Sequence, residues 1–331
     1  MLTVSSGFSD FYFHRWYTPL STFLRRALGL IPFSIGDVIY ITWVIASIIF
    51  FSKLIYTAIK RKWKLLLFQF LKGINALLTI YFVFLLFWGV NYQRKTLADD
   101  IELNVPEKYV RADLYLLSDT LLKLVNRDCD AVRHMPALSD KQLFHMATAG
   151  YARAKEQWPA LLYKNQSVKA TLFGRWMNYI GVTGYLNPFT NEAQVNTTVP
   201  AFVQPFTTCH EIAHQLGYAP EEDANFVGYL VASGANDVRF RYAANFEMFL
   251  YSIRHLARRD PSLTRLIWQK ANPLVREDYY RLMEFYDQFQ GPIDDYSAAV
   301  YDQYLKANHQ EKGIRSYSEV VGWLIAYFRK N

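Results

Sequence analysis

Acidic residues are absent from a long part of this sequence. None occurs between Asp37 and Asp99, although the chain of 331 residues contains 29 of them. Eight lysines and arginines lie in the same interval, so subtracting them from the net charge of +7 leaves −1 for the rest of the chain. The basic character therefore belongs to one segment, and it does not predict a surface for nucleic acid or another polyanion.

Other absences narrow the class of protein further. The only cysteines are Cys129 and Cys209, which allow at most one disulfide, and their spacing does not decide whether it forms. Cys209 is interpreted as a packing residue. No repeat or low-complexity segment occurs.

Residues 1–34 lack the smooth apolar core and the small-residue cleavage site of a signal peptide. Their aromatic and basic residues favour an amphipathic helix lying on a lipid bilayer.

Long apolar stretches fill the interval that lacks acids. One covers residues 35–59, and a second covers 73–92 without any charge. A membrane-crossing helix needs about 20 mainly apolar residues, so we expect two transmembrane helices within 35–92; a pair of buried core helices is the alternative. The basic loop between them, with Lys60, Arg61, Lys62 and Lys64, predicts a cytoplasmic loop and places both ends of the chain outside.

The remaining residues, 93–331, predict a mainly α domain of α+β class. Residues 91–108 are polar and indicate a linker, and helical spacing begins near Tyr109. Short strands are expected at 168–172, 181–186 and 193–198, where β-branched residues alternate with glycine and proline. A helical bundle should follow from about Phe206 to the C-terminus.

The sequence His210-Glu211-Ile212-Ala213-His214 carries the strongest chemical signal. Two histidines four residues apart project from one face of a helix and can bind one zinc ion, while the intervening Glu211 can act as general base on metal-bound water. The alternative is a helix with two incidental histidines. A glycine at Gly217 should end the helix.

A catalytic zinc needs a third protein ligand. Pro220 begins a new helix whose first turn contains Glu221, Glu222 and Asp223. We expect Glu221 to be the third ligand, with Asn225 one turn further on to hydrogen-bond a ligand histidine. Glu222 is the rival, and an ordinary cluster of acids at a helix start is the alternative to both.

This arrangement resembles the gluzincin metallopeptidases, in which a glutamate on the helix after the two histidines completes the site. Three longer phrases resemble a bacterial membrane-protein family known as "domain of unknown function 3810", which is grouped with zincin-like peptidases: PFSIGD at 32–37, NPFTNEA at 187–193 and CHEIAHQLGY at 209–218. The resemblance implies a zincin-like domain with a zinc site and a membrane anchor, and it favours Glu221 over Glu222. Together with the basic loop, it leads us to expect a protein of the bacterial inner membrane whose catalytic domain faces the periplasm. It implies no particular substrate.

Two further roles are expectations only. In zincins an edge strand beside the metal helix binds extended substrate, and residues 192–196 are expected to form it, with Ala193 and Asn196 at an exposed edge. An ordinary short strand is the alternative. We expect the residue that stabilises the oxyanion to lie in the C-terminal helices, and Tyr301 is the first choice. The candidates are Tyr296, Tyr301, Tyr304, His255 and His309.

The sequence thus predicts a membrane-anchored zinc peptidase that hydrolyses a peptide or protein substrate, with the lipid bilayer as its other partner. A catalytically silent zincin fold that serves as an envelope scaffold or sensor is the second hypothesis. A non-metal membrane adaptor is the third.

Overall fold

The computed structural model of the chain describes residues 5–106, 108–291, 296, 299–300, 302–303, 306–307 and 319–330. Within these residues the fold is mainly helical, with one small sheet, so the α+β class is confirmed. The first elements are α1 (Ser6–Phe11), η1 (Tyr12–Tyr17), α2 (Thr18–Leu28), α3 (Ile35–Ile59) and α4 (Trp63–Phe87). The others are η2 (Gly89–Gln93), α5 (Leu97–Asp100), α6 (Arg111–Arg133), α7 (Asp140–Gln157), η3 (Pro159–Leu161), β1 (Val168–Ala170), α8 (Gly174–Asn178), β2 (Gly184–Asn187), β3 (Glu192–Val195), α9 (Gln204–Gln215), α10 (Glu221–Ser233), α11 (Val238–Arg259), α12 (Pro261–Gln269), α13 (Pro273–Asp287) and α15 (Val320–Lys330).

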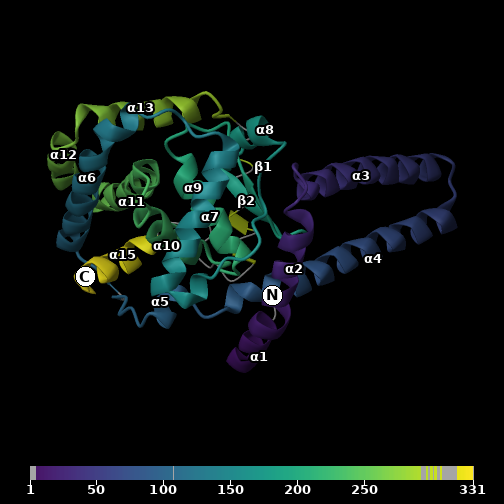
Figure 1. The fold of residues 1–331 in the computed structure, drawn as a ribbon. Coiled ribbons are helices and arrows are strands. Elements are labelled where there is room, and N and C mark those ends of the chain that lie inside the picture. Colours follow the sequence, from purple (N-terminus) through teal and green to yellow (C-terminus); the bar gives the residue numbers. More distant parts are fainter. Residues whose placement is uncertain are drawn as a thin grey trace.

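Helices α3 and α4 form a hairpin that extends away from the other elements (Figure 1). Their mean hydropathies are 2.1 and 2.0, and none of the most apolar window of either helix is buried. Both are long and apolar enough to cross a membrane. The second helix covers Trp63–Phe87 rather than residues 73–92, because Lys64 and Lys72 lie within a continuous helix and Trp88 leaves helical geometry (φ −149°).

The start of α3 is attached directly to the sheet. The buried Asp37 carboxylate accepts hydrogen bonds from the Leu172 backbone N–H (2.6 Å) and from the Tyr185 hydroxyl. The Gly36 N–H donates to the Glu192 carboxylate (2.6 Å). Hydrogen bonds to a buried charge are stronger than those between neutral groups, so they fix the direction in which the hairpin leaves the domain.

The sheet has the strand order β1-β3-β2. Strand β3 pairs in parallel with β1 and antiparallel with β2, so that Ala193 lies opposite both Val168 and Leu186. Helix α9 contacts β2 and β3 on one side and packs against α7, α10 and α11 on the other. Every residue of α9 is buried. Its histidines are therefore surrounded by protein rather than by solvent.

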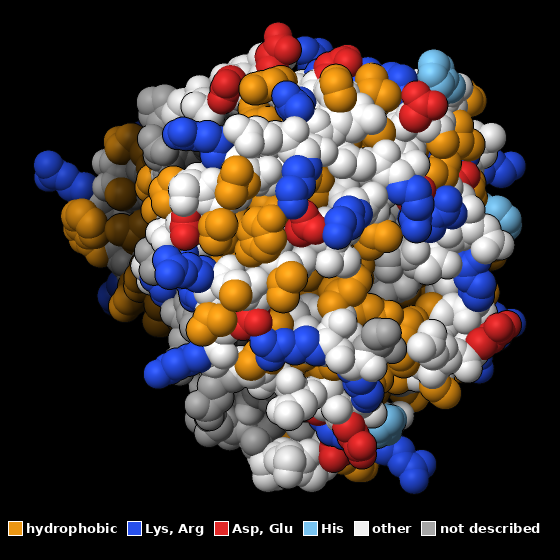
Figure 2. Space-filling view, turned by 90° about the vertical axis from the view of Figure 1, so that its left-hand side faces the viewer, with side chains coloured by type: hydrophobic (Ala, Val, Ile, Leu, Met, Phe, Trp, Pro, Cys, Tyr) orange, Lys and Arg blue, Asp and Glu red, His pale blue; other side chains and the backbone are white. Residues whose placement is uncertain are grey.

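The main hydrophobic core lies among α6, α9, α10 and α11. Side chains that are fully buried there include Leu121, Phe226, Phe246 and Phe249. On the side of the domain away from α3 and α4, charged side chains of both signs are mixed with hydrophobic ones (Figure 2). Such a mixture is typical of a surface that faces water, in contrast to the exposed apolar side chains of the hairpin.

The N-terminal segment does not lie free of the domain. Tyr17 is 1% exposed, and its hydroxyl donates to the carbonyl of Gln215 at the end of α9 (3.1 Å). Phe11 and Phe23 point outwards and are 62% and 66% exposed. One face of the segment is therefore part of the fold, while aromatic residues on other faces remain available to a bilayer.

Candidate metal centre

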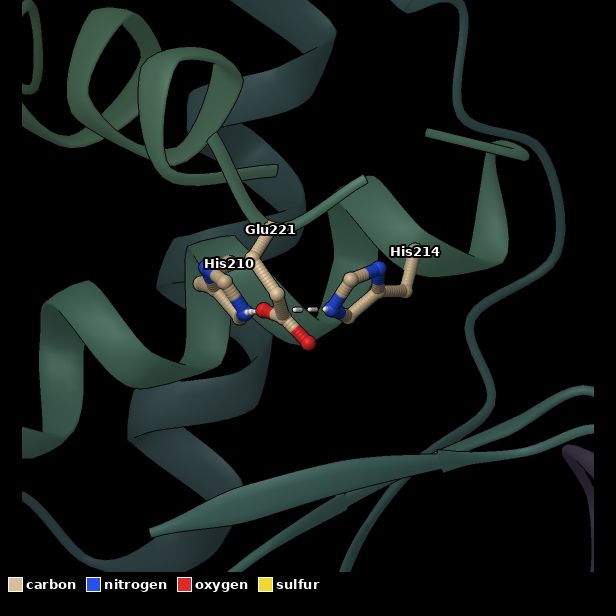
Figure 3. A group of neighbouring side chains, drawn as sticks. All are labelled: His210, His214 and Glu221. Carbon is tan, nitrogen blue, oxygen red and sulfur yellow. Dashed lines mark ion pairs between the residues drawn. The ribbon is translucent and has the colours of Figure 1, made fainter. Parts of the chain in front are cut away.

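Helix α9 presents His210 and His214 one turn apart, as their spacing predicts. Both residues are 7% exposed, and the two rings lie 4.6 Å apart between centroids with an interplanar angle of 89°. The rings therefore do not stack on each other. They direct nitrogen atoms into the same small space (Figure 3).

A tight turn after α9 brings the next helix back to the histidines. Gly217 has φ +91°, a conformation that L side chains rarely adopt, and it ends the helix. The Tyr218 carbonyl then accepts a hydrogen bond of 2.7 Å from His214 Nδ1. This bond leaves Nε2 of His214 as the nitrogen that faces the centre and fixes the ring orientation. Helix α10 begins directly afterwards, at Glu221.

Glu221 completes a group of three. Its Oε2 lies 3.3 Å from His210 Nε2 and 3.6 Å from His214 Nε2 (Figure 3). His210, His214 and Glu221 each offer one possible ligand atom, and these three atoms lie within 4.8 Å of one another. The rival Glu222 is partly exposed and does not belong to this group. The structure therefore brings together the three residues expected as ligands.

The geometry of this group fits zinc. Zinc binds histidine nitrogen and carboxylate oxygen at about 2.0–2.2 Å in tetrahedral sites. Two such ligand atoms are then about 3.3 Å apart by trigonometry, and the observed distances are 3.3 and 3.6 Å. Two imidazoles with one carboxylate are also a ligand set of catalytic zinc, which keeps a fourth position open.

The charges in the group also favour a cation. Burial opposes ionisation of Glu221, but the hydrogen bonds and charges of the two histidines hold its pKa well below its usual range. Burial likewise opposes protonation of His214, but Glu221 and Glu211 raise its pKa to about 9. Burial lowers the pKa of His210. Metal binding requires both histidines in the neutral form, so a metal cation would replace any proton held at this position.

Glu211 lies beside His214 and Glu221, and its carboxylate faces strand β2. It is 3% exposed, and burial raises its pKa to about 8, with Glu221 adding to the effect and His214 opposing it. Its carboxylate touches Gly184 of β2, where an added Cβ would lie 2.6 Å from Oε1. A larger residue at this point of the strand would therefore require the Glu211 side chain to move. The arrangement leaves a carboxyl group of near-neutral pKa next to the metal position.

The expected supporting residue is also in place. Asn225, one turn after Glu221, lies near the His210 ring and acts to raise its pKa, against the larger opposite effect of burial. Helices α9 and α10 can approach closely because Gly228 lies over His210, where an added Cβ would be 3.1 Å from the backbone. His214 thus has a second hydrogen-bonding partner, the Tyr218 carbonyl, that orients its ring.

Residues from the N-terminal part of the chain support the end of α9. Arg25 donates to the Gln215 carbonyl (2.9 Å), and Arg94 donates to the Leu216 carbonyl (2.7 Å). The last carbonyls of a helix lack partners within the helix and carry partial negative charge, so cations stabilise them. The Trp88 ring, at the end of α4, lies 6.0 Å from the His214 ring. The candidate metal centre is therefore next to the end of the apolar hairpin.

A cleft of about 1420 Å³ opens onto the three ligands and Glu211. Sequence reasoning overlooked Tyr251 of α11, which lines this cleft together with Glu247. Burial raises the pKa of Tyr251 well above its usual value, and the charges of Glu247 and Glu221 add to this. Tyr251 therefore stays protonated and is a hydrogen-bond donor. The sequence feature that could have indicated Tyr251 is a line of polar residues along α11, all of which line the cleft: Glu247, Tyr251, Arg254 and Arg258.

The prediction of an exposed substrate strand at residues 192–196 was wrong. Strand β3 is the central strand, and Ala193 and Asn196 are both 0% exposed. The Asn196 amide donates to the carbonyls of Gly174 and Val182 and thereby joins the loops around β2. Both sides of β3 are occupied by neighbouring strands, so neither residue can bind an extended substrate. The strand at the sheet edge beside Glu211 is β2.

The other candidates have different outcomes. Tyr301, Tyr304 and His309 lie outside the described residues. Tyr296 is 73% exposed, and His255 lines the cleft and hydrogen-bonds Tyr109 (3.0 Å). Both cysteines, Cys129 and Cys209, are free and buried in helices.

Comparison with known proteins gives one match. No curated protein and no solved structure matches this chain. The family described as "Protein of unknown function (DUF3810)" matches residues 12–325, which include the hairpin, the sheet and the group of His210, His214 and Glu221. The chain therefore belongs to this family of proteins of unknown function.

Proposed function

We propose that this protein is a membrane-anchored, zinc-dependent peptidase of zincin type. The observation that carries the proposal is the convergence of His210, His214 and Glu221 at zinc-ligand separations, with Glu211 buried beside them. A zinc ion bound there would supply a water of near-neutral pKa and would polarise a substrate carbonyl. Two imidazoles and a carboxylate beside a second carboxylate match the needs of amide hydrolysis.

The protein's own residues carry the proton transfers and hold the substrate. Glu211 takes a proton from the attacking water and later gives it to the amine nitrogen as the C–N bond breaks, while the hydroxyl oxygen becomes part of the new carboxylate. Strand β2, the edge strand next to Glu211, holds the extended peptide through main-chain hydrogen bonds. Tyr251 donates a hydrogen bond to the oxygen that becomes negative.

The proposed location follows from the hairpin. We propose that α3 and α4 cross the inner membrane of a bacterium and that the domain faces the periplasm. Lys60, Arg61 and Lys62 lie at the end of the hairpin away from the domain (Figure 1), where positive charge favours the cytoplasmic side. This orientation places the metal centre at the outer surface of the membrane.

Metal removal tests the proposal directly. We expect the purified full-length protein to contain about one zinc ion per chain and to cleave members of a random peptide library. Dialysis against a chelator should abolish cleavage, and one equivalent of zinc should restore it. The readouts are metal analysis and mass spectrometry of the peptides. Bound zinc without any cleavage would instead favour the silent scaffold or sensor, and protein that binds no zinc would exclude both.

Tyr251→Phe tests the assigned hydrogen-bond donor. Loss of one oxyanion donor typically lowers kcat by about 10²–10³-fold, and we expect a decrease in this range with little change in KM or zinc content. Tyr280→Phe is the matched control, because Tyr280 is 66% exposed on α13. Steady-state kinetics on a cleaved peptide provide the measurement. A Tyr251→Phe enzyme with unchanged kcat would remove this residue from the mechanism.

A further inference from the structure

The metal cleft does not end at the domain. Its lining includes Tyr40 of α3 in addition to residues around the ligands. The Tyr40 ring stacks on that of Tyr185 in β2, with centroids 6.1 Å apart, and Trp43 contacts Phe189 edge to face at 5.0 Å. The edge strand and the first apolar helix are therefore in contact at the mouth of the cleft.

A second hollow of about 630 Å³ continues from this point along α3. Tyr40 lines both spaces, and Val44, Ser47, Ile48 and Phe51 are among the residues that line the second one. Ser47 has a smaller side chain than Val44, Ile48 and Phe51 beside it. From Tyr40 to Ile55 the lining residues recur at helical spacing and extend about 22 Å along the helix at 1.5 Å per residue.

This face of α3 is not covered within the described residues. Val44, Ile48, Phe51 and Ile55 are 59–62% exposed. Helix α4 packs on a different side, since the Phe50 ring lies over Gly73. The face is therefore a continuous apolar groove that leads from the metal cleft into the region the bilayer would occupy. We call it the α3 groove, defined by Tyr40, Val44, Ser47, Ile48, Phe51 and Ile55.

We propose that the substrates are membrane-anchored polypeptides whose apolar segment lies in the α3 groove while the adjacent extramembrane residues occupy the cleft. This inference rests on the proposed peptidase function and on insertion of α3 and α4 into a bilayer. Because Tyr40 lines both the cleft and the α3 groove, the two spaces are continuous, and this favours a polypeptide as the occupant. A chain held along β2 would pass directly onto α3. A lipid tail or a second copy of the protein could cover an apolar face, but neither needs a connection to the metal cleft.

A reconstituted system tests the groove by kinetics. The probes are a peptide library with a randomised tail attached to a Leu/Ala transmembrane helix of about 20 residues, and the same tails without the helix. With the full-length zinc protein in liposomes, we expect Ser47→Trp to raise KM for the anchored probe about tenfold and to leave the soluble tails unaffected. Leu78→Trp is the control, because Leu78 is 62% exposed on α4 and does not line the groove. Equal effects on both probes, or no effect of Ser47→Trp on the anchored one, would refute the proposal.

A crosslinking experiment tests the occupant of the α3 groove independently of the proposed peptidase function. A photoreactive benzoylphenylalanine replaces Ser47, or Leu78 as control, in the zinc-loaded Glu211→Gln protein, which does not need to hydrolyse anything. We expect position 47 to crosslink the anchored probe much more than position 78 does. If the wild-type protein cleaves no peptide and position 47 still crosslinks the anchored probe, the proposed peptidase function is wrong and the assignment of the α3 groove stands. Equal labelling at both positions, or a crosslink only to lipid or to a second copy, would contradict the assigned occupant.

Discussion

Glu211→Gln is expected to lower peptide hydrolysis by about 10³-fold while the protein still holds about one zinc ion per chain. General base catalysis contributes about 10²–10⁴-fold, and glutamine cannot accept the proton of the attacking water. The substitution keeps the size of the side chain, so it still fits against Gly184. The measurement is the cleavage rate of a library-derived peptide together with zinc content.

Stability provides the control for this variant. Burial raises the pKa of Glu211, which means that its charged form is disfavoured in the fold. The neutral glutamine should therefore leave the thermal midpoint in detergent unchanged or slightly raised. An enzyme that keeps the wild-type rate after this substitution cannot use Glu211 as its base. A variant that loses zinc as well would instead make Glu211 a participant in metal binding.

The second large effect that we expect is the loss of zinc affinity when Glu221, the proposed third ligand, is replaced. Glu221→Gln should weaken zinc binding by at least about 10²-fold, because loss of a residue that only supports a ligand already costs 10–100-fold. The carboxylate contributes a negative charge 3.3 and 3.6 Å from the two ligand nitrogens, whereas an amide contributes none. Competition with a chromophoric chelator measures the zinc affinity, and hydrolysis at limiting zinc should fall in parallel.

Glu222→Gln is a matched control for this experiment. Glu222 is the next residue of the same helix turn but is partly exposed and lies outside the ligand group. Its substitution should leave the zinc affinity within about twofold of wild type, since exposed charges interact weakly in water. If Glu222→Gln weakens zinc binding and Glu221→Gln does not, the assignment of the third ligand is wrong.

The sequence by itself determined the local features of this protein. The spacing of His210 and His214 places them on one helical face, and Gly217 and Pro220 mark the turn that returns Glu221. The long apolar runs indicate two helices, and the three strands fall within a few residues of their expected positions. All of these depend on residues close together in the chain, where backbone geometry and side-chain periodicity are sufficient.

Strand order and the walls of the cleft were decided only in the tertiary structure. Three short strands of similar composition do not reveal that β3 lies in the middle, so the sequence placed Ala193 and Asn196 at an edge that belongs to β2. Tyr251 reaches the cleft from a helix that follows α10, and Arg25 reaches the end of α9 across 190 positions of sequence. Periodicity shows which face of a helix is buried but not which distant element covers it, because that choice depends on the packing of the whole domain.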